Sequence, residues 1–216
     1  MAIISPSILS GDFANMGRDM NNIAANGAKW VHVDIMDGNF VPNITMGQPV
    51  VRSLRKATDL VMDVHLMIKN PLQYVEEFCQ AGADILSFHI EADTVENNLL
   101  ALEKIKACGV RPAIALRPLT PAEAVKPYLD KVDMILAMTV EPGFGGQAFM
   151  HETMPRLKEI RRMIDEVNPG CLLQVDGGVD VHTAPICKEN GADVLVAGSA
   201  YFKAIDRAEF VRIVEE

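Results

Sequence analysis

Short apolar runs alternate with longer amphipathic segments along the whole chain. The apolar runs predict strands over Ile3–Leu9, Trp30–Met36, Leu60–Met67, Ile85–His89, Arg111–Arg117, Met134–Met138, Cys171–Asp176 and Val194–Ala197. The amphipathic segments predict helices over Asp12–Ala25, Gln48–Ala57, Pro71–Ala81, Val95–Cys108, Pro121–Tyr128, His151–Val167, His182–Asn190 and Arg207–Val214. Many of these helices begin at a start signal such as Asn70-Pro71 and end near a glycine such as Gly82.

This alternation gives eight strand–helix units in a chain of 216 residues, which is the plan of a compact (β/α)8 barrel, or TIM barrel. The phrases NGAKWVHVD, AGADILSFH and NGADVLVAG resemble one another and indicate a weak repeat of this unit. A doubly wound open sheet is the alternative, because alternation is common to both folds. The lack of a dinucleotide-binding GxGxxG motif favours the barrel, and the lack of a linker predicts one domain over residues 1–216.

Polar side chains interrupt the apolar strands with a period of two. Side chains alternate along a strand, so His32 and Asp34 share one face of the second strand, and the third and seventh strands place His65 and Asp176 in phase. If these faces point into a barrel, the four side chains meet near its carboxyl-terminal mouth. Two histidines and two carboxylates suit a divalent transition metal. The alternative is a set of hydrogen-bonded core residues.

Three glycine-rich turns follow the last three strands: Glu141–Gln147, Asp176–Gly178 and Ala197–Ser199. Glycine lets backbone N–H groups approach a phosphate closely, and barrel enzymes often bind phosphate at this end, although tight turns alone would also explain the glycines. The chain also has 12 methionines, and three of them fall at predicted strand ends, where they either fill the core or form an apolar floor that excludes water: Met36, Met67 and Met138.

Composition and charge narrow the classes of partner. Lys and Arg total 20 against 29 Asp and Glu, a net charge of −9, which argues against a nucleic-acid surface. No stretch approaches the roughly 18 apolar residues of a membrane span, and the N-terminal MAIISPSILSGDF lacks the features of a secretory signal. Because the four cysteines form no CxxC pair, we expect reduced thiols in a cytoplasmic protein: Cys79, Cys108, Cys171 and Cys187.

Several long motifs resemble those of the ribulose-phosphate 3-epimerase family, an isomerase family of the pentose phosphate pathway. They are SPSILSGDFANM from Ser5, HVDIMDGNFVPNITMG from His32, DVHLMI from Asp63, MTVEPGFGGQAF from Met138, VDGGV from Val175 and VAGSAYF from Val196. Their order is that of the family and they span nearly the whole chain. The resemblance implies a (β/α)8 barrel that interconverts D-ribulose 5-phosphate and D-xylulose 5-phosphate through an enediolate intermediate. It also implies a homo-oligomer, either a dimer or a hexamer.

The resemblance also implies roles for individual residues. The ligands of one divalent metal ion, zinc or iron first and manganese or cobalt as alternatives, would be His32, Asp34, His65 and Asp176. The two proton carriers would be Asp34 and Asp176. The substrate, a ketose phosphate, would meet Ser7, His65, Met36, Met67, Met138, Gly143, Phe144, Gly145, Gly146, Gly177, Gly178, Gly198 and Ser199. The loop Val140–Met150 is expected to close over the phosphate.

Three other functions compete with this one. The same chemistry on another ketose phosphate, such as D-allulose 6-phosphate, shares most of the motifs. A metal-dependent phosphosugar hydrolase would use a metal-bound water, and a non-catalytic sugar-phosphate binder would not need two proton carriers. One residue departs from the family pattern: Arg117 stands where the family often has asparagine or lysine, as a surface charge or as a contact to the substrate.

Overall fold

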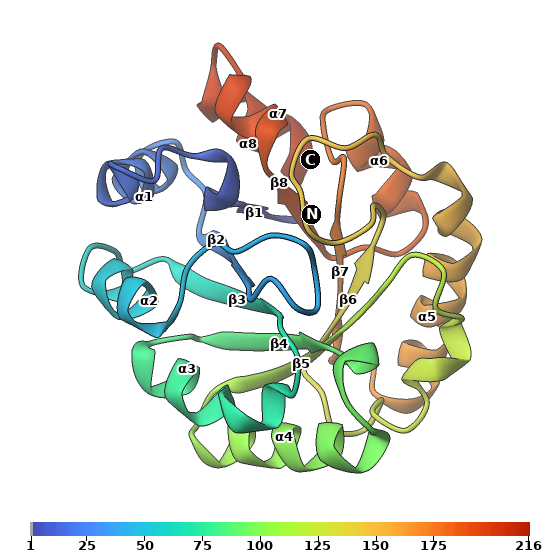
Figure 1. Cartoon of the computed structure of the whole chain (residues 1–216). Helices are drawn as coiled ribbons and strands as arrows, with labels where there is room; N and C mark the ends of the chain where they lie inside the picture. Colours follow the sequence, from blue (N-terminus) through green and yellow to red (C-terminus); the bar gives the residue numbers. More distant parts are fainter. Residues whose placement is uncertain (1) are drawn as a thin grey trace.

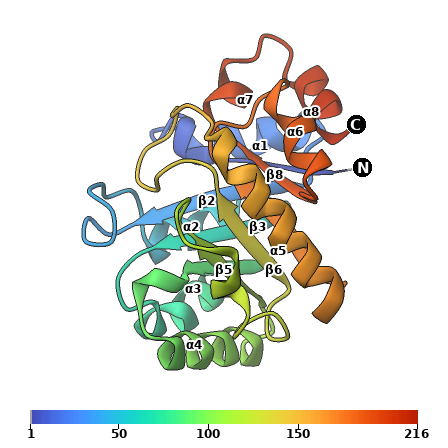
Figure 2. The same ribbon diagram turned by 90° about the vertical axis from the view of Figure 1, so that its right-hand side faces the viewer.

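Eight parallel strands surround the centre of the molecule, and helices cover their outer side (Figures 1 and 2). The computed structural model describes residues 2–216. Neighbouring strands pair in the order β1-β8-β7-β6-β5-β4-β3-β2, and a parallel bridge between Ser7 and His32 joins the two ends of this order. The predicted (β/α)8 barrel is therefore confirmed. The strands are β1 (Ile3–Pro6), β2 (Trp30–Met36), β3 (Val61–Met67), β4 (Ile85–His89), β5 (Arg111–Leu116), β6 (Met134–Met138), β7 (Leu172–Asp176) and β8 (Val194–Ala197).

A helix or a short 3-10 turn follows each strand. The α-helices are α1 (Met16–Ala25), α2 (Gln48–Arg55), α3 (Val75–Ala81), α4 (Val95–Ala107), α5 (Met154–Val167), α6 (Thr183–Glu189), α7 (Ser199–Lys203) and α8 (Arg207–Glu215). The 3-10 turns are η1 (Ile8–Ser10), η2 (Pro71–Gln73), η3 (Ile90–Ala92), η4 (Ala122–Val125) and η5 (His151–Thr153).

The clearest corrections to the predicted elements fall at three places. The helix predicted over Pro121–Tyr128 is only the turn η4, because Pro127 lacks a backbone N–H and its ring clashes with the preceding helical turn. The first strand stops at Pro6, and η1 replaces its predicted end. Helix α7, which starts at Ser199, was not predicted. Four strands, β2, β4, β6 and β8, have the predicted bounds.

The alternation of side chains divides each strand between two environments. On β2, the outward residues Val31, Val33 and Ile35 belong to the large core beneath the helices. The inward side chains stack in layers along the barrel axis. The lowest layer is an apolar cluster of Trp30, Ile85, Ala113, Met134 and Val194. Above it the β2 and β3 side chains pair across the strands, His32 beside Asp63, then Asp34 beside His65, then Met36 beside Met67. The polar layers thus lie near the carboxyl-terminal mouth, on an apolar floor.

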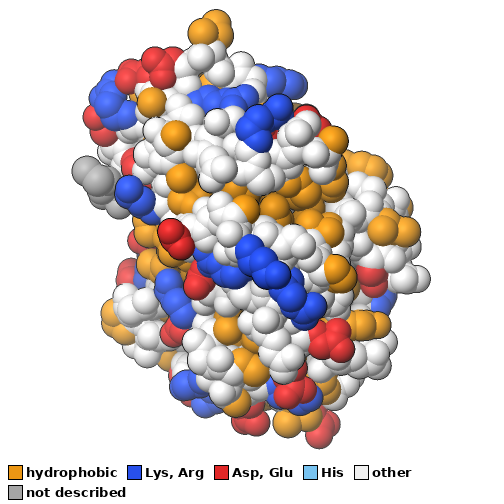
Figure 3. All heavy atoms as spheres, turned by 90° about the vertical axis from the view of Figure 1, so that its left-hand side faces the viewer, with side chains coloured by type: hydrophobic (Ala, Val, Ile, Leu, Met, Phe, Trp, Pro, Cys, Tyr) orange, Lys and Arg blue, Asp and Glu red, His pale blue; other side chains and the backbone are white. Residues whose placement is uncertain are grey.

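The charges of one face and the state of the four cysteines complete the description of the fold. The face in Figure 3 carries Lys and Arg side chains in separate groups, with acidic, apolar and uncharged side chains between them. Within residues 2–216 no helix has the length and apolar character needed to cross a bilayer. All four cysteines are free thiols.

Candidate metal centre and active site

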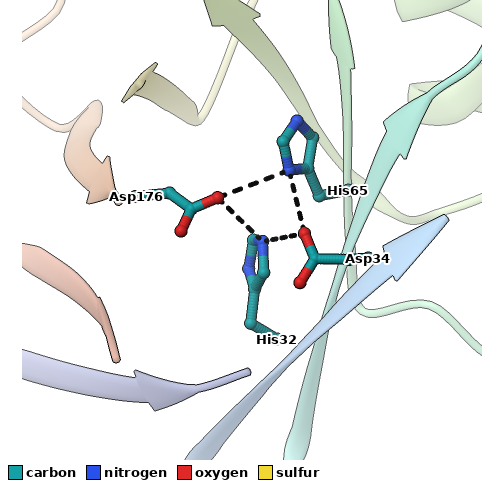
Figure 4. A group of neighbouring side chains, drawn as sticks. All are labelled: His32, Asp34, His65 and Asp176. Carbon is teal, nitrogen blue, oxygen red and sulfur yellow. Dashed lines mark ion pairs between the residues drawn. The ribbon is translucent and has the colours of Figure 1, made fainter. Parts of the chain in front are cut away.

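The four side chains predicted as metal ligands converge at the mouth of the barrel (Figure 4). One nitrogen or oxygen atom from each lies within 4.8 Å of the others. Asp34 Oδ1 lies 3.3 Å from His32 Nε2 and 3.4 Å from His65 Nδ1. Asp176 Oδ2, from the end of β7, lies 3.9 and 3.8 Å from the same two nitrogens. Three strands therefore contribute to one compact cluster.

The unpaired nitrogens and the carboxylate oxygens of this cluster fit a divalent metal ion. Both histidine rings are fully buried, yet His32 Nε2 and His65 Nδ1 have no hydrogen-bond partner among the described residues. An unpaired buried polar atom costs about 1–3 kcal/mol, so a fold rarely keeps two of them side by side without a use. Two imidazole nitrogens and two carboxylate oxygens are also the donor set that divalent transition metals accept.

Asp63 supports the His32 ring from below. Its Oδ2 lies 2.7 Å from His32 Nδ1 and also accepts hydrogen bonds from Ser5 Oγ and Gln174 Nε2. All four of these side chains are fully buried. A carboxylate behind a ligating histidine fixes the ring and leaves the opposite nitrogen free. Asp63 and Gln174 each lie two residues before a predicted ligand, on the same face of the strand, but sequence reasoning gave them no role.

The His65 ring is supported from the neighbouring strand, β4. His65 Nε2 lies 3.0 Å from His89 Nε2, and His89 Nδ1 lies 3.2 Å from Glu91 Oε2. The second carboxylate oxygen, Oε1, accepts hydrogen bonds from the backbone N–H of Arg117, at 2.9 Å, and from the Thr120 hydroxyl. Sequence reasoning missed this chain of contacts. His89 was within reach, because it is in phase with Ser87 on the inner face of β4.

One cleft, with about 560 Å³ of space that is partly open to solvent, lies over the cluster. Ser7 Oγ donates a hydrogen bond of 2.5 Å to Asp34 Oδ2 at its floor. His65 is not among the residues that line the cleft, whereas Ser10 and Gln147 line it without having been predicted. The remaining predicted substrate-binding residues all line this cleft: Ser7, Met36, Met67, Met138, Gly143, Phe144, Gly145, Gly146, Gly177, Gly178, Gly198 and Ser199.

Two glycines of the cleft wall are required by close packing. Gly177 and Gly178 have φ of +126° and +66°, a region that residues with a Cβ rarely adopt. A Cβ on Gly177 would lie 2.6 Å from a Val140 methyl carbon, and one on Gly178 would lie 2.7 Å from the Phe149 nitrogen. The turn after β7 therefore packs directly against the loop that follows β6.

The comparisons with known proteins agree with this geometry. The model of the ribulose-phosphate 3 epimerase family matches residues 3–202. The chain belongs to this family. A ribulose-phosphate 3-epimerase of Bacillus subtilis (strain 168) is 46% identical over 98% of this chain and 97% of its own length. One from Rhodobacter capsulatus is 48% identical over 93% and 86%. As a member of the family, the chain is an epimerase of the isomerase class.

Solved structures of other phosphosugar enzymes share the fold. A 3-keto-L-gulonate-6-phosphate decarboxylase from Vibrio cholerae superposes with a TM-score of 0.75 at 11% identity, over 99% of this chain and 95% of that one. A 3-hexulose-6-phosphate synthase from Salmonella typhimurium gives 0.72 at 16%, over 99% and 96%. At these identities the likeness shows the barrel alone.

The electrostatics of this epimerase divide the two carboxyl groups of the cluster. Burial by itself would raise the pKa of Asp34, but His32 and His65 outweigh it and hold that pKa well below the usual range. Burial and the charge of Asp34 raise the pKa of Asp176 to about 6. Burial disfavours the charged form of His32, yet Asp63 and Asp34 together raise its pKa well above the usual value. One carboxyl is thus held ionised while the other accepts a proton more readily.

Arg117, the departure from the family pattern, does not line the cleft. Its guanidinium lies 4.4 Å from the centre of the Phe40 ring and donates a 3.0 Å hydrogen bond to the Phe40 carbonyl. It also lies 3.8 Å from Glu141. Arg117 therefore connects the loop after β2 with the start of the loop after β6, and the contact to the substrate considered from the sequence stays a prediction.

Proposed function

We propose that this epimerase interconverts D-ribulose 5-phosphate and D-xylulose 5-phosphate by moving the proton on C3 between two aspartates. The observation that carries the proposal is the pair Asp34 and Asp176, which come from different strands and meet at the floor of one cleft. Epimerisation removes a proton next to a carbonyl and returns one to the opposite face of the carbon. Two faces require two proton carriers, and the two aspartates supply them.

The unequal environments of the two carboxyl groups suit this exchange. Asp34 is ionised and acts as base in one direction, while Asp176, whose pKa is raised, carries the proton to the other face. The roles reverse after each turnover. Ser7 fixes the orientation of Asp34 through its hydrogen bond to Oδ2. A divalent metal ion held by His32, Asp34, His65 and Asp176 would supply Lewis-acid stabilisation of the negative charge that develops on the substrate oxygens.

The walls of the cleft provide the remaining functions. Met36, Met67 and Met138 are nearly fully buried, line the cleft and form apolar walls that keep water from the enediolate. The glycine turns at Gly143–Gly146, Gly177–Gly178 and Gly198–Ser199 bring backbone N–H groups towards the phosphate. Phosphate contacts far from C3 supply binding energy that positions the reacting carbon.

We also propose that the loop Val140–Met150 closes over the bound phosphate. The Asn43 side chain donates a 3.1 Å hydrogen bond to the Gly143 carbonyl, so the loop is already tethered on one side of the cleft. Substrate is expected to protect this loop from limited proteolysis. An unchanged cleavage rate would contradict closure.

The experiment that tests the reaction follows ribulose 5-phosphate in deuterated water by proton NMR. Metal-replete protein is expected to place deuterium on C3 and to form xylulose 5-phosphate, and chelator-treated protein is expected to do neither. If the metal-replete enzyme gives no exchange, the substrate is another ketose phosphate, and a panel that includes D-allulose 6-phosphate identifies it.

Four finer expectations remain predictions: zinc or iron as the native metal, a homo-oligomer, a cytoplasmic location, and one domain over residues 1–216. Metal analysis of protein purified without added metal tests the first, and the mass of the particle in solution tests the second.

A further inference from the structure

The two histidines of the cluster each have one nitrogen that faces the proposed metal position and one nitrogen that faces the protein. For His65 the facing atom is Nδ1, and it serves as a ligand only when it carries a lone pair. The hydrogen of the neutral ring must then be on Nε2. Hydrogen positions follow from the network of donors and acceptors around the ring, and that network runs from His65 through His89 to Glu91.

We propose that Glu91 and His89 are positioning residues that set the tautomer of His65, so that its Nδ1 presents a lone pair to the metal ion. The inference rests on the proposed metal centre and adds to it the residues that prepare one of its ligands.

Glu91 sets the direction in which hydrogens are donated along this network. Its Oε1 faces the backbone N–H of Arg117 and the hydroxyl of Thr120. A backbone N–H only donates, so Oε1 must accept. A glutamate carboxyl ordinarily titrates at about 4.3, so Glu91 is ionised at neutral pH and has no hydrogen of its own. Oε2 must therefore also accept, and the hydrogen between it and His89 belongs to His89 Nδ1.

The remaining two steps follow from the chemistry of a neutral imidazole, which has one N–H and one lone pair. With its hydrogen on Nδ1, His89 has a lone pair on Nε2. The contact of 3.0 Å between His89 Nε2 and His65 Nε2 then requires His65 to donate. Nδ1 of His65 keeps the lone pair, and it is the atom that has no hydrogen-bond partner within residues 2–216. Three contacts thus agree on one direction.

Packing prevents the His89 ring from turning over and reversing this order. His89 is fully buried. The Phe40 ring lies on it at a centroid distance of 4.9 Å, and the His65 ring lies at 5.0 Å. The Arg117 guanidinium contacts the Phe40 ring in turn. A rotation of His89 would require these neighbours to move, so the direction that Glu91 sets is retained at His65.

The substitution Glu91→Gln tests the proposal because it keeps the shape of the side chain and reverses the direction of the hydrogen bond to His89. The two donors at Oε1 hold the amide oxygen there, which leaves the amide NH₂ facing His89 Nδ1. His89 must then accept at Nδ1 and carry its hydrogen on Nε2, and His65 is driven to place its hydrogen on Nδ1. We expect the dissociation constant for Zn²⁺, measured by competition with a chelator, to rise by about 10–100-fold.

Thr120→Val is the matched control. It removes one hydrogen bond from the same Oε1 but leaves a carboxylate facing His89, so the direction and the Zn²⁺ affinity are expected to stay as in the unmodified chain. An unchanged Zn²⁺ affinity in Glu91→Gln, or an equal loss in Thr120→Val, would overturn the proposal. If the unmodified chain binds no Zn²⁺, the proposed metal centre itself fails, which is a separate result.

A spectroscopic measurement tests the tautomers without relying on affinity. The chain has five histidines, and nitrogen-15 labelling of histidine with long-range proton–nitrogen correlation spectra reports which ring nitrogen carries hydrogen. In the Zn²⁺-loaded chain we expect the hydrogen on Nδ1 of His89 and on Nε2 of His65, and in Glu91→Gln we expect it on Nε2 of His89. A hydrogen on Nε2 of His89 in the unmodified chain overturns the proposal, even if the variant does not fold.

Discussion

The two histidines of the metal cluster are held from behind in different ways. His32 meets a carboxylate directly, Asp63, at 2.7 Å and in the fully buried interior of the barrel. His65 reaches a carboxylate only through His89, and this carboxylate, Glu91, lies nearer the rim with 23% of its side chain exposed. Both arrangements leave one imidazole nitrogen free to bind a metal.

The difference lies in how hydrogen bonds are shared between the two oxygens of each carboxylate. Asp63 Oδ2 receives His32, Ser5 and Gln174 together, while its Oδ1 is buried and has no partner in the described part of the chain. Glu91 uses one oxygen for Arg117 and Thr120 and the other for His89. An asparagine can replace Asp63, because its amide oxygen can take the place of Oδ2 and accept from all three donors. At Glu91 the same replacement reverses the hydrogen bond to His89. The support of His32 by Asp63, the inner support, therefore depends on burial. The support of His65 by His89 and Glu91, the outer support, depends on which group donates the hydrogen in each bond.

The largest expected effect comes from changing the carboxylate that both histidines face. Asp34→Asn removes one proton carrier and is expected to lower turnover by about 10²–10⁴-fold while substrate still binds. Turnover, substrate binding and metal content are measured on the same preparation, so that loss of the base is separated from loss of the metal. The exposed Asp59, changed to Asn, is the control. Near-normal turnover in Asp34→Asn would rule out the two-base scheme.

The second effect concerns the inner support. Asp63→Ala leaves three buried donors without an acceptor, and we expect the free energy of unfolding to fall by about 3–5 kcal/mol. Asp63→Asn keeps an acceptor for them but places a buried amide nitrogen at the Oδ1 position, so the expected loss is about 1–3 kcal/mol. Urea denaturation of the metal-free proteins measures both. Equal losses would show that the charge of Asp63, and not its hydrogen bonds, supports His32.

The ligand cluster that this inner support holds could be predicted from the sequence, although Asp63 was given no role. The period of two in Trp30–Met36 and its repeat in the third and seventh strands placed His32, Asp34, His65 and Asp176 together, as the structure does. The strands could be predicted because a short apolar run between turn residues is a local signal. The helix predicted over Pro121–Tyr128 failed although Pro127, also a local signal, argued against it.

The outer support could not be predicted in the same way. His89 was visible as an inward residue of β4, but Glu91 lies on η3, beyond the strand. The two donors that fix Glu91 come from 26 and 29 residues later in the chain. They reach it because β4 and β5 pair in one register. Such contacts depend on the closed barrel, which periodicity along one strand does not describe.

The third effect is the contribution of Glu91, in the outer support, to the pH dependence of stability. The pKa of Glu91 is lowered from an ordinary 4.5 to about 2 in the folded chain, so its ionised form stabilises the fold above about pH 4.5, and this stabilisation is lost as the pH falls towards 2. We expect the unmodified chain to lose on the order of 2–3 kcal/mol from this group across that range. Glu91→Gln does not titrate, so the difference in unfolding free energy between the two metal-free proteins should shrink with falling pH. A constant difference would contradict the lowered pKa.

The smallest effect separates the backbone of Arg117 from its side chain. The backbone N–H supports Glu91, whereas the guanidinium contacts Phe40 and lies 3.8 Å from Glu141. Arg117→Met keeps the N–H and the apolar stem but loses the hydrogen bond to the Phe40 carbonyl and the cation–π contact, which together stabilise the loop by about 1–2 kcal/mol. We expect a few-fold higher KM, because the loop after β2 contacts the cleft-lining loop after β6 through Asn43, and an unchanged Zn²⁺ affinity. Glu141→Gln, which breaks only the exposed ion pair, is expected to change KM less. A loss of Zn²⁺ affinity in Arg117→Met would mean that the side chain, through Phe40 and His89, also holds the tautomer of His65, and the outer support would then depend on packing as the inner one does.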